Sequence, residues 1–157
     1  MLDKIIDKII NWILQILGIS KEQKTEKEEL IYNKKNFMTE AELNFYHKIK
    51  VLEKEYNIIP QINLGTIVEK QNKGYRNELF KNIDFAIFDK NFNDILLLIE
   101  LNDKTHNKTN RKERDLRVKK ICSDANIKLI TFYTKYSNEK EYVLKRILEE
   151  INKKEIK

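Results

Sequence analysis

Two acidic residues, Asp84 and Glu100, stand where a β-hairpin would bring their side chains together. Each adjoins a run of apolar residues that is typical of a strand, and the segment between the runs, residues 89–94, is rich in turn formers. A hairpin with its loop centred near Asn91 or Phe92 places the two carboxylates opposite each other, roughly 5 Å apart at Cβ. Like charges at that distance repel, and a hard divalent cation between them removes the repulsion. The pair therefore indicates a metal site, and the competing interpretation is two unrelated, solvated charges.

The residues that follow Glu100 add polar side chains to the same neighbourhood. If the chain stays extended, the two-residue period of a strand puts Asn102, Lys104 and His106 on the face that carries Glu100. Asn102 and Asp103 are also turn formers, so the extended stretch can end at once. The sequence leaves both alternatives open for this segment.

A helix predicted after this segment carries arginine toward the sheet. Its buried stripe, spaced i, i+3, i+4 and i+7, consists of Val118, Ile121, Cys122 and Ala125. Continued backward by four and seven residues, the stripe reaches Arg114 and Arg111, whose planar guanidinium forks suit phosphate. A solvated basic helix face is the alternative, and it suffices for three further cations that are expected to face water: Arg117, Lys119 and Lys120.

Positive charge concentrates around this helix. Residues 103–120 contain eight Lys or Arg, Lys108 among them, against three Asp or Glu, which is a net charge of +5 out of the chain's +6. A local positive field beside paired carboxylates fits a polyanion held next to a metal ion. The overall basicity is weaker support, because a chain this rich in Lys, Asn and Ile can be basic through compositional bias alone.

The remaining elements predict one α/β domain over residues 37–157. Thr39 and Glu42 form a capping box that opens a helix, and Glu42 also leads the inward stripe, so it either caps the helix or reaches the site. Besides the hairpin, strands are expected at 58–64 and 127–132, and residues 144–151 mark a closing helix. The resulting order of elements is α-β-β-β-α-β-α.

An amphipathic helix, residues 1–19, precedes this domain and is separated from it by a charged linker, residues 20–36. Its polar residues recur every turn, so it cannot span a bilayer as an unbroken apolar stretch does. Its apolar face is nevertheless too broad to stay in water. The helix is expected to lie in a membrane interface, to pack on the domain or to pair with another copy, with no preference between lipid and protein.

Composition excludes several other kinds of site. The single cysteine, Cys122, leaves no disulfide framework, and on a buried stripe its thiol is expected to be inert. No Cys/His cluster has zinc spacing, and the three glycines form no phosphate-binding loop. We expect a cytoplasmic protein, held at the inner face of the membrane if the first helix lies in lipid.

Three motifs together resemble those of a known family: Ile83-Asp84-Phe85, the run from Glu100-Leu101-Asn102 to His106, and Arg114-Asp115. Their order is similar to that of a bacterial domain of unknown function in the restriction-endonuclease-like, or PD-(D/E)XK, nuclease superfamily, and to endonucleases of the very-short-patch-repair type. The resemblance runs from about residue 38 to 132 and includes the segments 39–42 and 60–64. It implies a restriction-endonuclease-like α-β-β-β-α-β core with a closing C-terminal helix.

The resemblance also implies a divalent-metal-dependent nuclease that hydrolyses phosphodiester bonds in nucleic acid, with DNA as the first candidate substrate and RNA as the second. Mg²⁺ or Mn²⁺ would be held by Asp84, Glu100 and the Leu101 carbonyl. Lys104 or His106 would position the scissile phosphate or assist proton transfer. The residues expected to bind the nucleic acid are Lys108, Arg111 and Arg114, and further candidates for the site are Glu42, Gln61 and Asp115.

Asn102 departs from the pattern, which has Asp at this position in the family and often Lys in the superfamily. Its amide can offer a carbonyl oxygen to a metal or orient a water, which keeps it among the catalytic candidates, but it is neither a charged ligand nor a base. The alternative function is therefore a catalytically degenerate module of the same fold that binds nucleic acid or a protein partner without cleavage.

Overall fold

The computed structural model describes residues 2–17, 31–72, 74, 76–102, 109–134, 136 and 138–153, without the side chains of residues 2–3 and 109–112. The chain divides into two units, Met1–Lys35 and Asn36–Lys157, and each is described by itself.

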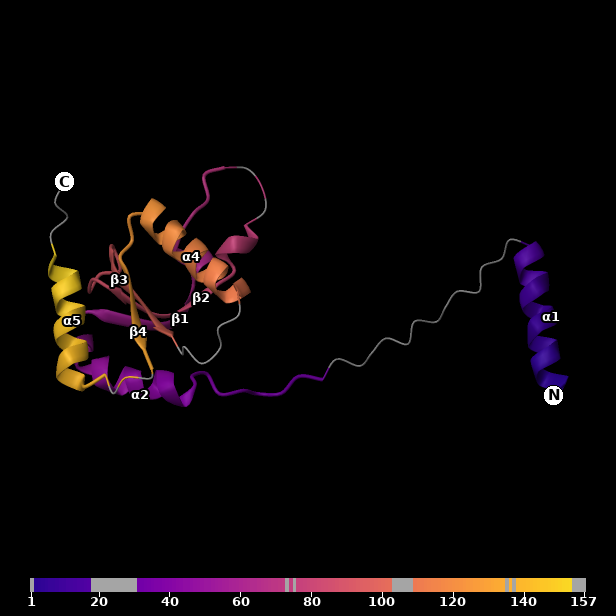
Figure 1. Ribbon diagram of the computed structural model, residues 1–157, viewed down its shortest axis with the longest axis horizontal. Coiled ribbons are helices and arrows are strands. Elements are labelled where there is room, and N and C mark those ends of the chain that lie inside the picture. The colour runs from indigo at the N-terminus through magenta and orange to yellow at the C-terminus, as the bar shows by residue number, and fades with distance from the viewer. Residues whose placement is uncertain are drawn as a thin grey trace. The chain divides into compact units, whose positions relative to one another are not determined.

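Within the described residues of the second unit, four strands form one mixed sheet in the order β1-β2-β3-β4 (Figure 1). Strands β1 (Asn57–Asn63), β2 (Asn82–Phe88) and β3 (Ile95–Asn102) pair antiparallel. The β2–β3 connection is a short hairpin loop, whereas residues 64–81 join β1 to β2. Strand β4 (Leu129–Tyr133) lies parallel to β3, and the crossover between them contains helix α4 (Thr109–Asp124). The predicted α/β class and the expected order of strands and helices are confirmed.

Helix α2 (Glu40–Ile49) begins where the sequence places its cap. It has the predicted capping box, in which Thr39 Oγ1 accepts from the Glu42 amide at 3.3 Å and the Thr39 amide donates to Glu42 Oε2 at 2.6 Å. It continues into a 3₁₀ turn, η1 (Lys50–Lys54). Two short elements, α3 (Leu64–Ile67) and η2 (Asn77–Leu79), precede β2, and α5 (Lys140–Asn152) closes the chain.

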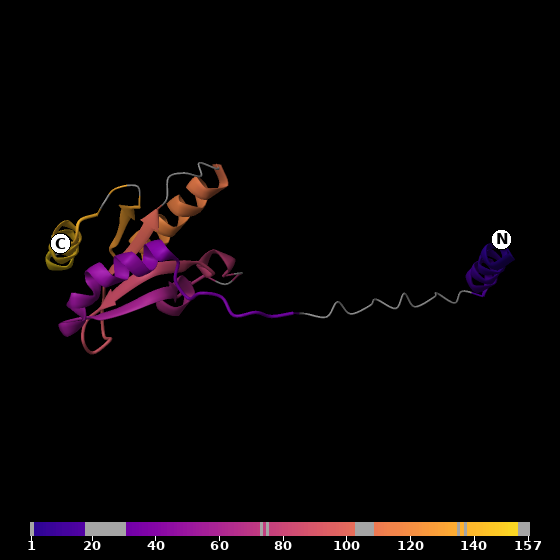
Figure 2. The ribbon, with the colours of Figure 1, turned by 90° about the horizontal axis from the view of Figure 1, so that it is seen from below.

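The sheet separates two hydrophobic cores, because its strands are apolar on both faces. The α2/α5-side core packs Phe45 and Ile49 of α2 and Val143 and Ile147 of α5 onto one face. The α4-side core packs Val118 and Cys122 of α4 onto the other, against strand residues that include Ala86 and Leu98. Figures 1 and 2 show the sheet between α4 and the pair formed by α2 and α5. Asp84 and Glu100 lie two residues from Ala86 and Leu98, and both border a pocket together with residues of α4, so both carboxylates are on the α4 side of the sheet.

One part of the expected α4 stripe is wrong. Val118 and Cys122 are buried and Ile121 is half-buried, but Ala125 is exposed. The reason is that α4 ends at Asp124, so Ala125 already belongs to the turn that leads to β4.

The first unit contains helix α1 (Leu2–Ile16), which carries the amphipathic pattern expected of residues 1–19. Most of its large apolar side chains are exposed, namely Ile5, Ile6, Ile9, Ile10, Trp12, Ile13 and Ile16, whereas Leu14 is half-buried. None of the helices that the structure describes combines the length and the hydropathy needed for a membrane span. The broad apolar face of α1 is therefore the feature that a test of its role must change.

Replacing Ile9 and Ile13 by Asp places two charges in the middle of this face and should abolish the association that α1 makes. Flotation with liposomes reports attachment to lipid, and gel filtration of the same samples reports self-association. A shortened chain that starts at Glu29 is the reference for the absence of α1. If the full chain, the double variant and the shortened chain behave alike in both experiments, α1 makes neither contact.

Candidate functional site

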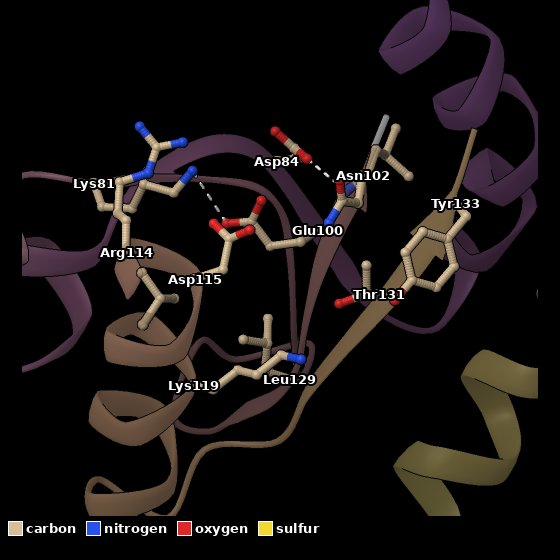
Figure 3. A pocket seen from close by; sticks show the side chains of 12 residues that line it. Lys81, Asp84, Glu100, Asn102, Arg114, Asp115, Lys119, Leu129, Thr131 and Tyr133 are labelled. Carbon is tan, nitrogen blue, oxygen red and sulfur yellow. Dashed lines mark hydrogen bonds and ion pairs between the residues drawn. The ribbon is translucent and has the colours of Figure 1, made fainter. Parts of the chain in front are cut away.

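Asp84 and Glu100 lie next to each other across the β2–β3 pair. The register pairs Phe85 with Ile99 and Ala86 with Leu98, so one residue further Asp84 falls opposite Glu100. The two strands are also joined there by a side chain, because the Leu101 amide donates to Asp84 Oδ2 at 2.6 Å (Figure 3). The hairpin predicted from the turn-forming segment is confirmed, and with it the neighbourhood of the two carboxylates.

The same row continues into the outer strands of the sheet. The pairs Pro60–Phe85 and Ile62–Ile83 flank Gln61, which therefore falls opposite Asp84. On the other side, Glu100 pairs with Thr131 of β4. Each of the four strands thus contributes one polar residue to a single line across the sheet.

Gln61 interrupts the regular alternation of β1. Its φ of 54° is in the left-handed region, which non-glycine residues adopt rarely. Ile59 and Ile62 both pack on the α4-side core although they are three residues apart, so the alternation shifts by one residue at Gln61. This conformation accompanies a hydrogen bond from Gln61 Nε2 to Glu42 Oε1 at 2.9 Å. The residue with the unfavourable backbone conformation is thus one of the four polar residues in this row, and such conformations are often found at functional sites.

Glu42 both caps its helix and reaches the site. Oε2 accepts from the Thr39 amide, and Oε1 accepts from Gln61. Its carboxylate is also close enough to Asp84 to raise the pKa of that residue. The two roles considered for Glu42 in the sequence are therefore compatible, since each oxygen serves one of them.

Both central carboxyls resist ionisation. Burial raises the pKa of Asp84, and Glu42 adds to this, while the hydrogen bond from the Leu101 amide opposes it. Burial raises the pKa of Glu100 to about 7, Lys81 opposes the shift, and Asp84 and Asp115 add to it. Among the described residues, Glu100 Oε1 is buried and accepts no hydrogen bond. The nearest compensation is the Lys81 ammonium, 3.6 Å from that oxygen.

A pocket of about 240 Å³ opens above this pair, between α4 and the ends of β2, β3 and β4. Figure 3 shows side chains of α4 facing those of the strands across it. The lining residues are Lys81, Asp84, Glu100, Leu101, Asn102, Arg114, Asp115, Val118, Lys119, Leu129, Thr131 and Tyr133. The pocket therefore brings three carboxylates and three cationic side chains to one opening.

The donors at the bottom of the pocket fit a hard divalent cation. Within the part of the chain that the structure describes, no three His, Cys, Asp or Glu side chains form a ready metal cluster. Mg²⁺, however, is usually bound through one or two carboxylates, with substrate phosphates and waters completing its shell. Glu100 offers a buried oxygen without a hydrogen bond. The Leu101 carbonyl lies on the same side of β3 as the Leu101 amide, hence toward Asp84.

The structure brings together some of the predicted site residues and is silent on others. Asn102 is on the face of Glu100, as predicted, and lines the pocket together with Arg114 and Asp115. The residues that lie outside the described ones are Lys104, His106 and Lys108. Arg111 belongs to α4, but its side chain is not described.

Lys119 corrects the expected orientation of α4. Its side chain is exposed to water, as expected, but it does not face away from the site, because it also lines the pocket. Four residues of α4 border the pocket: Arg114, Asp115, Val118 and Lys119. Arg114 and Val118 belong to the predicted stripe, and the residue after each of them also borders the pocket. Arg117 and Lys120 do point elsewhere: the charge of Arg117 acts on Glu78, and Lys120 pairs with Asp124 at 2.9 Å.

Sequence reasoning missed Lys81, Thr131 and Tyr133. Lys81 precedes β2 by one residue, so the period of the strand did not place it. Thr131 did leave a signal, since it is a polar residue at the alternate position of an otherwise apolar strand.

The raised pKa values predict how stability depends on pH without divalent cations. A carboxyl whose pKa is raised from 4.5 to about 7 by folding keeps its proton in the native state after the unfolded state has lost it. The free energy of unfolding should therefore fall between about pH 4.5 and 7.5, by up to about 3 kcal/mol. Urea titrations in chelator should show this fall for the wild type and much less of it for Glu100→Gln.

Glu149→Gln is the matched control for that experiment, because Glu149 is an exposed carboxylate on α5, paired with Lys145. Its stability should follow the wild-type pH dependence. Parallel curves for the wild type and Glu100→Gln would contradict the buried, proton-retaining Glu100.

Comparison with known proteins gives one match. Residues 34–151 match the model of a family described as a protein of unknown function (DUF2726). No curated protein and no solved structure matches the chain. The matched range includes all the described elements that border the pocket, which are β2, β3, α4 and β4. The chain belongs to the family of proteins of unknown function DUF2726.

Proposed function

We propose that the protein is a divalent-metal-dependent nuclease that hydrolyses phosphodiester bonds in nucleic acid. DNA is the first candidate substrate and RNA the second. The observation that carries the proposal is the adjacency of Asp84 and Glu100 at the bottom of a pocket whose rim carries Lys81, Arg114 and Lys119. Paired carboxylates suit a hard cation, and cationic side chains around them suit a phosphodiester. Neither half of this arrangement would be needed by a purely structural domain.

The fold supports the same proposal. An antiparallel β1-β2-β3 meander, followed by a crossover helix and a parallel β4, is the order implied by the resemblance to the restriction-endonuclease-like superfamily. The motif residues Asp84, Glu100, Arg114 and Asp115 come together at one end of the sheet. We propose that the DUF2726 domain of this chain has that superfamily's fold.

In this proposal, Asp84, Glu100 and the Leu101 carbonyl would hold Mg²⁺ or Mn²⁺. The ion would supply a Lewis acid that polarises the phosphoryl group and stabilises the charge that develops in an in-line displacement. Asp84 is oriented by the Leu101 amide. Glu42 of α2, which accepts a hydrogen bond from Gln61 of β1, lies close to Asp84 as well. Preorganisation of this kind keeps the carboxylates in place while the charge near them changes.

The cationic side chains of α4 would bind the nucleic acid. Arg114 lies on the pocket rim, beside Asp115, and its guanidinium can contact the phosphates that flank the scissile bond. Lys104, His106, Lys108 and Arg111 keep the roles that the resemblance implies as part of this proposal.

A second function rests on Asn102, which lines the pocket where the family motif has an acid. An amide adds no charge to a metal site and takes no proton from water. A module that binds nucleic acid or a protein without cleaving it is therefore the second candidate, and a cleavage assay separates the two.

Purified protein with Mn²⁺ or Mg²⁺ should nick plasmid DNA. Asp84→Ala and Glu100→Ala should each reduce the rate by about 100-fold or more, since each removes a charged metal ligand. Circular dichroism establishes that the variants fold, and Asp124→Ala, which removes an exposed α4 carboxylate, should cleave like the wild type. Binding of nucleic acid without cleavage under any divalent cation would favour the binding module instead. The same assay with an RNA substrate shows whether the protein cleaves DNA or RNA faster.

Binding of nucleic acid in Ca²⁺ should depend on Arg114. Arg114→Ala should weaken binding and reduce the slope of log K against log salt by about 0.9, the loss of one phosphate contact. Arg117→Ala is a matched control on the same helix, because Arg117 acts on Glu78 and does not line the pocket. Equal losses from the two variants would indicate a diffuse basic surface in place of a defined contact.

A further inference from the structure

Lys81 stands at the edge of the pocket with a fixed backbone. Its carbonyl accepts from the Leu64 amide at 2.7 Å. The next residue, Asn82, pairs with Asn63 at the end of the β1–β2 ladder, and the Asn63 side chain donates to Asn82 Oδ1 at 3.1 Å. These contacts hold the Cα of Lys81 in place, while its side chain extends into the pocket toward Glu100 (Figure 3).

The contact between Lys81 and Glu100 is an ion pair without a hydrogen bond. Nζ lies 3.6 Å from Oε1, and the two side chains are only 24% and 19% exposed. At that separation the ammonium offsets the charge of the carboxylate, yet Oε1 accepts no hydrogen bond from any residue that the structure describes. Lys81 therefore compensates Glu100 incompletely, and a better ligand for Oε1 can replace it.

We propose that Lys81 alternates between two partners: the Glu100 carboxylate in the metal-free protein, and a non-bridging phosphate oxygen of the nucleic acid once a divalent cation occupies Glu100. This assignment rests on the proposed nuclease function and adds a phosphate-contacting residue to it. A divalent cation at Oε1 satisfies that oxygen and repels the ammonium. The four-carbon stem of lysine lets its three donors turn to the pocket without moving the backbone.

Among the described residues, Lys81 is the cation that pairs with Glu100, and so it lies next to the proposed metal ligand. Asn102, two residues beyond Glu100, carries no charge, and Arg114 lies on the α4 side of the pocket. During hydrolysis, a water oxygen would bond to phosphorus and lose its proton to solvent. The bond to the leaving sugar oxygen would break, and that oxygen would keep the bonding electron pair and take a proton from solvent. Lys81 would keep its proton throughout and would stabilise the added negative charge on the phosphoryl oxygens.

Lys81→Met tests this proposal, because losing the contact with Glu100 and losing the contact with the phosphate should have opposite effects: Mn²⁺ binding should become tighter and cleavage slower. Methionine keeps much of the aliphatic length and removes the charge. Without the competing ammonium, Mn²⁺ should bind about five- to tenfold more tightly in calorimetry at pH 8. Without a donor for the phosphate, cleavage at saturating Mn²⁺ should fall by about 100-fold. A merely structural role would weaken both metal binding and cleavage.

Two further variants sharpen the test. Lys81→Arg keeps the charge, so Mn²⁺ affinity should return toward the wild-type value and cleavage should recover in part. Lys145→Met removes a lysine from an exposed pair with Glu149 on α5, and it should change neither quantity. Thermal unfolding of each variant shows that the fold is retained.

The outcomes separate this inference from the proposed function. If the wild type cleaves and Lys81→Met binds Mn²⁺ no more tightly, or cleaves as fast, the role of Lys81 is overturned while the nuclease stands. If the wild type cleaves nothing under any divalent cation, the nuclease has failed, and tighter Mn²⁺ binding by Lys81→Met still supports Lys81 as the counter-ion. If the wild type binds no Mn²⁺, the Lys81 proposal is overturned as well.

Discussion

The site depends on one constraint: two carboxylates sit side by side and largely buried at the end of the β2–β3 hairpin. Asp84 is held by the Leu101 amide at 2.6 Å. Among the described residues, the buried oxygen of Glu100 accepts no hydrogen bond and lies 3.6 Å from the Lys81 ammonium. Burial raises the pKa of both carboxyls, that of Glu100 to about 7, and so disfavours two negative charges side by side. An arrangement that costs stability in this way is characteristic of functional sites.

The neighbouring elements surround these two carboxylates with polar side chains. Gln61 takes a left-handed conformation opposite Asp84 and ties it, through Glu42, to the first turn of α2. On the other face, α4 covers the α4-side core with Val118 and Cys122 and then brings Arg114 and Asp115 to the pocket rim. The two helices thus bracket the end of the sheet from opposite sides, and each has its own hydrophobic core to fix its position.

Local rules predicted the parts of the site that depend on strand geometry. The turn-rich segment predicted a hairpin centred near Asn91 or Phe92. The pairing of Phe85 with Ile99 corresponds to the centre at Phe92, although the register shifts between Ile87 and Phe88. The position of Asn102 on the face of Glu100 followed from a period of two. Lys81 escaped because it lies one residue before β2, where periodicity gives no direction. Lys119 was misplaced because the buried stripe of a helix defines its core contact, whereas the pocket borders a wider arc. The shift at Gln61 depends on a partner in α2, which no local pattern in β1 reveals.

The central claim is that Asp84 and Glu100 hold a divalent cation. Crystals of the wild-type protein soaked in Mn²⁺ and measured at its absorption edge test this without any assumption about the substrate. The account predicts one anomalous peak bounded by Asp84, Glu100 and the Leu101 carbonyl, with the Lys81 ammonium turned away from Glu100. A Lys81–Glu100 pair that persists in Mn²⁺, with no peak between the carboxylates, would contradict it.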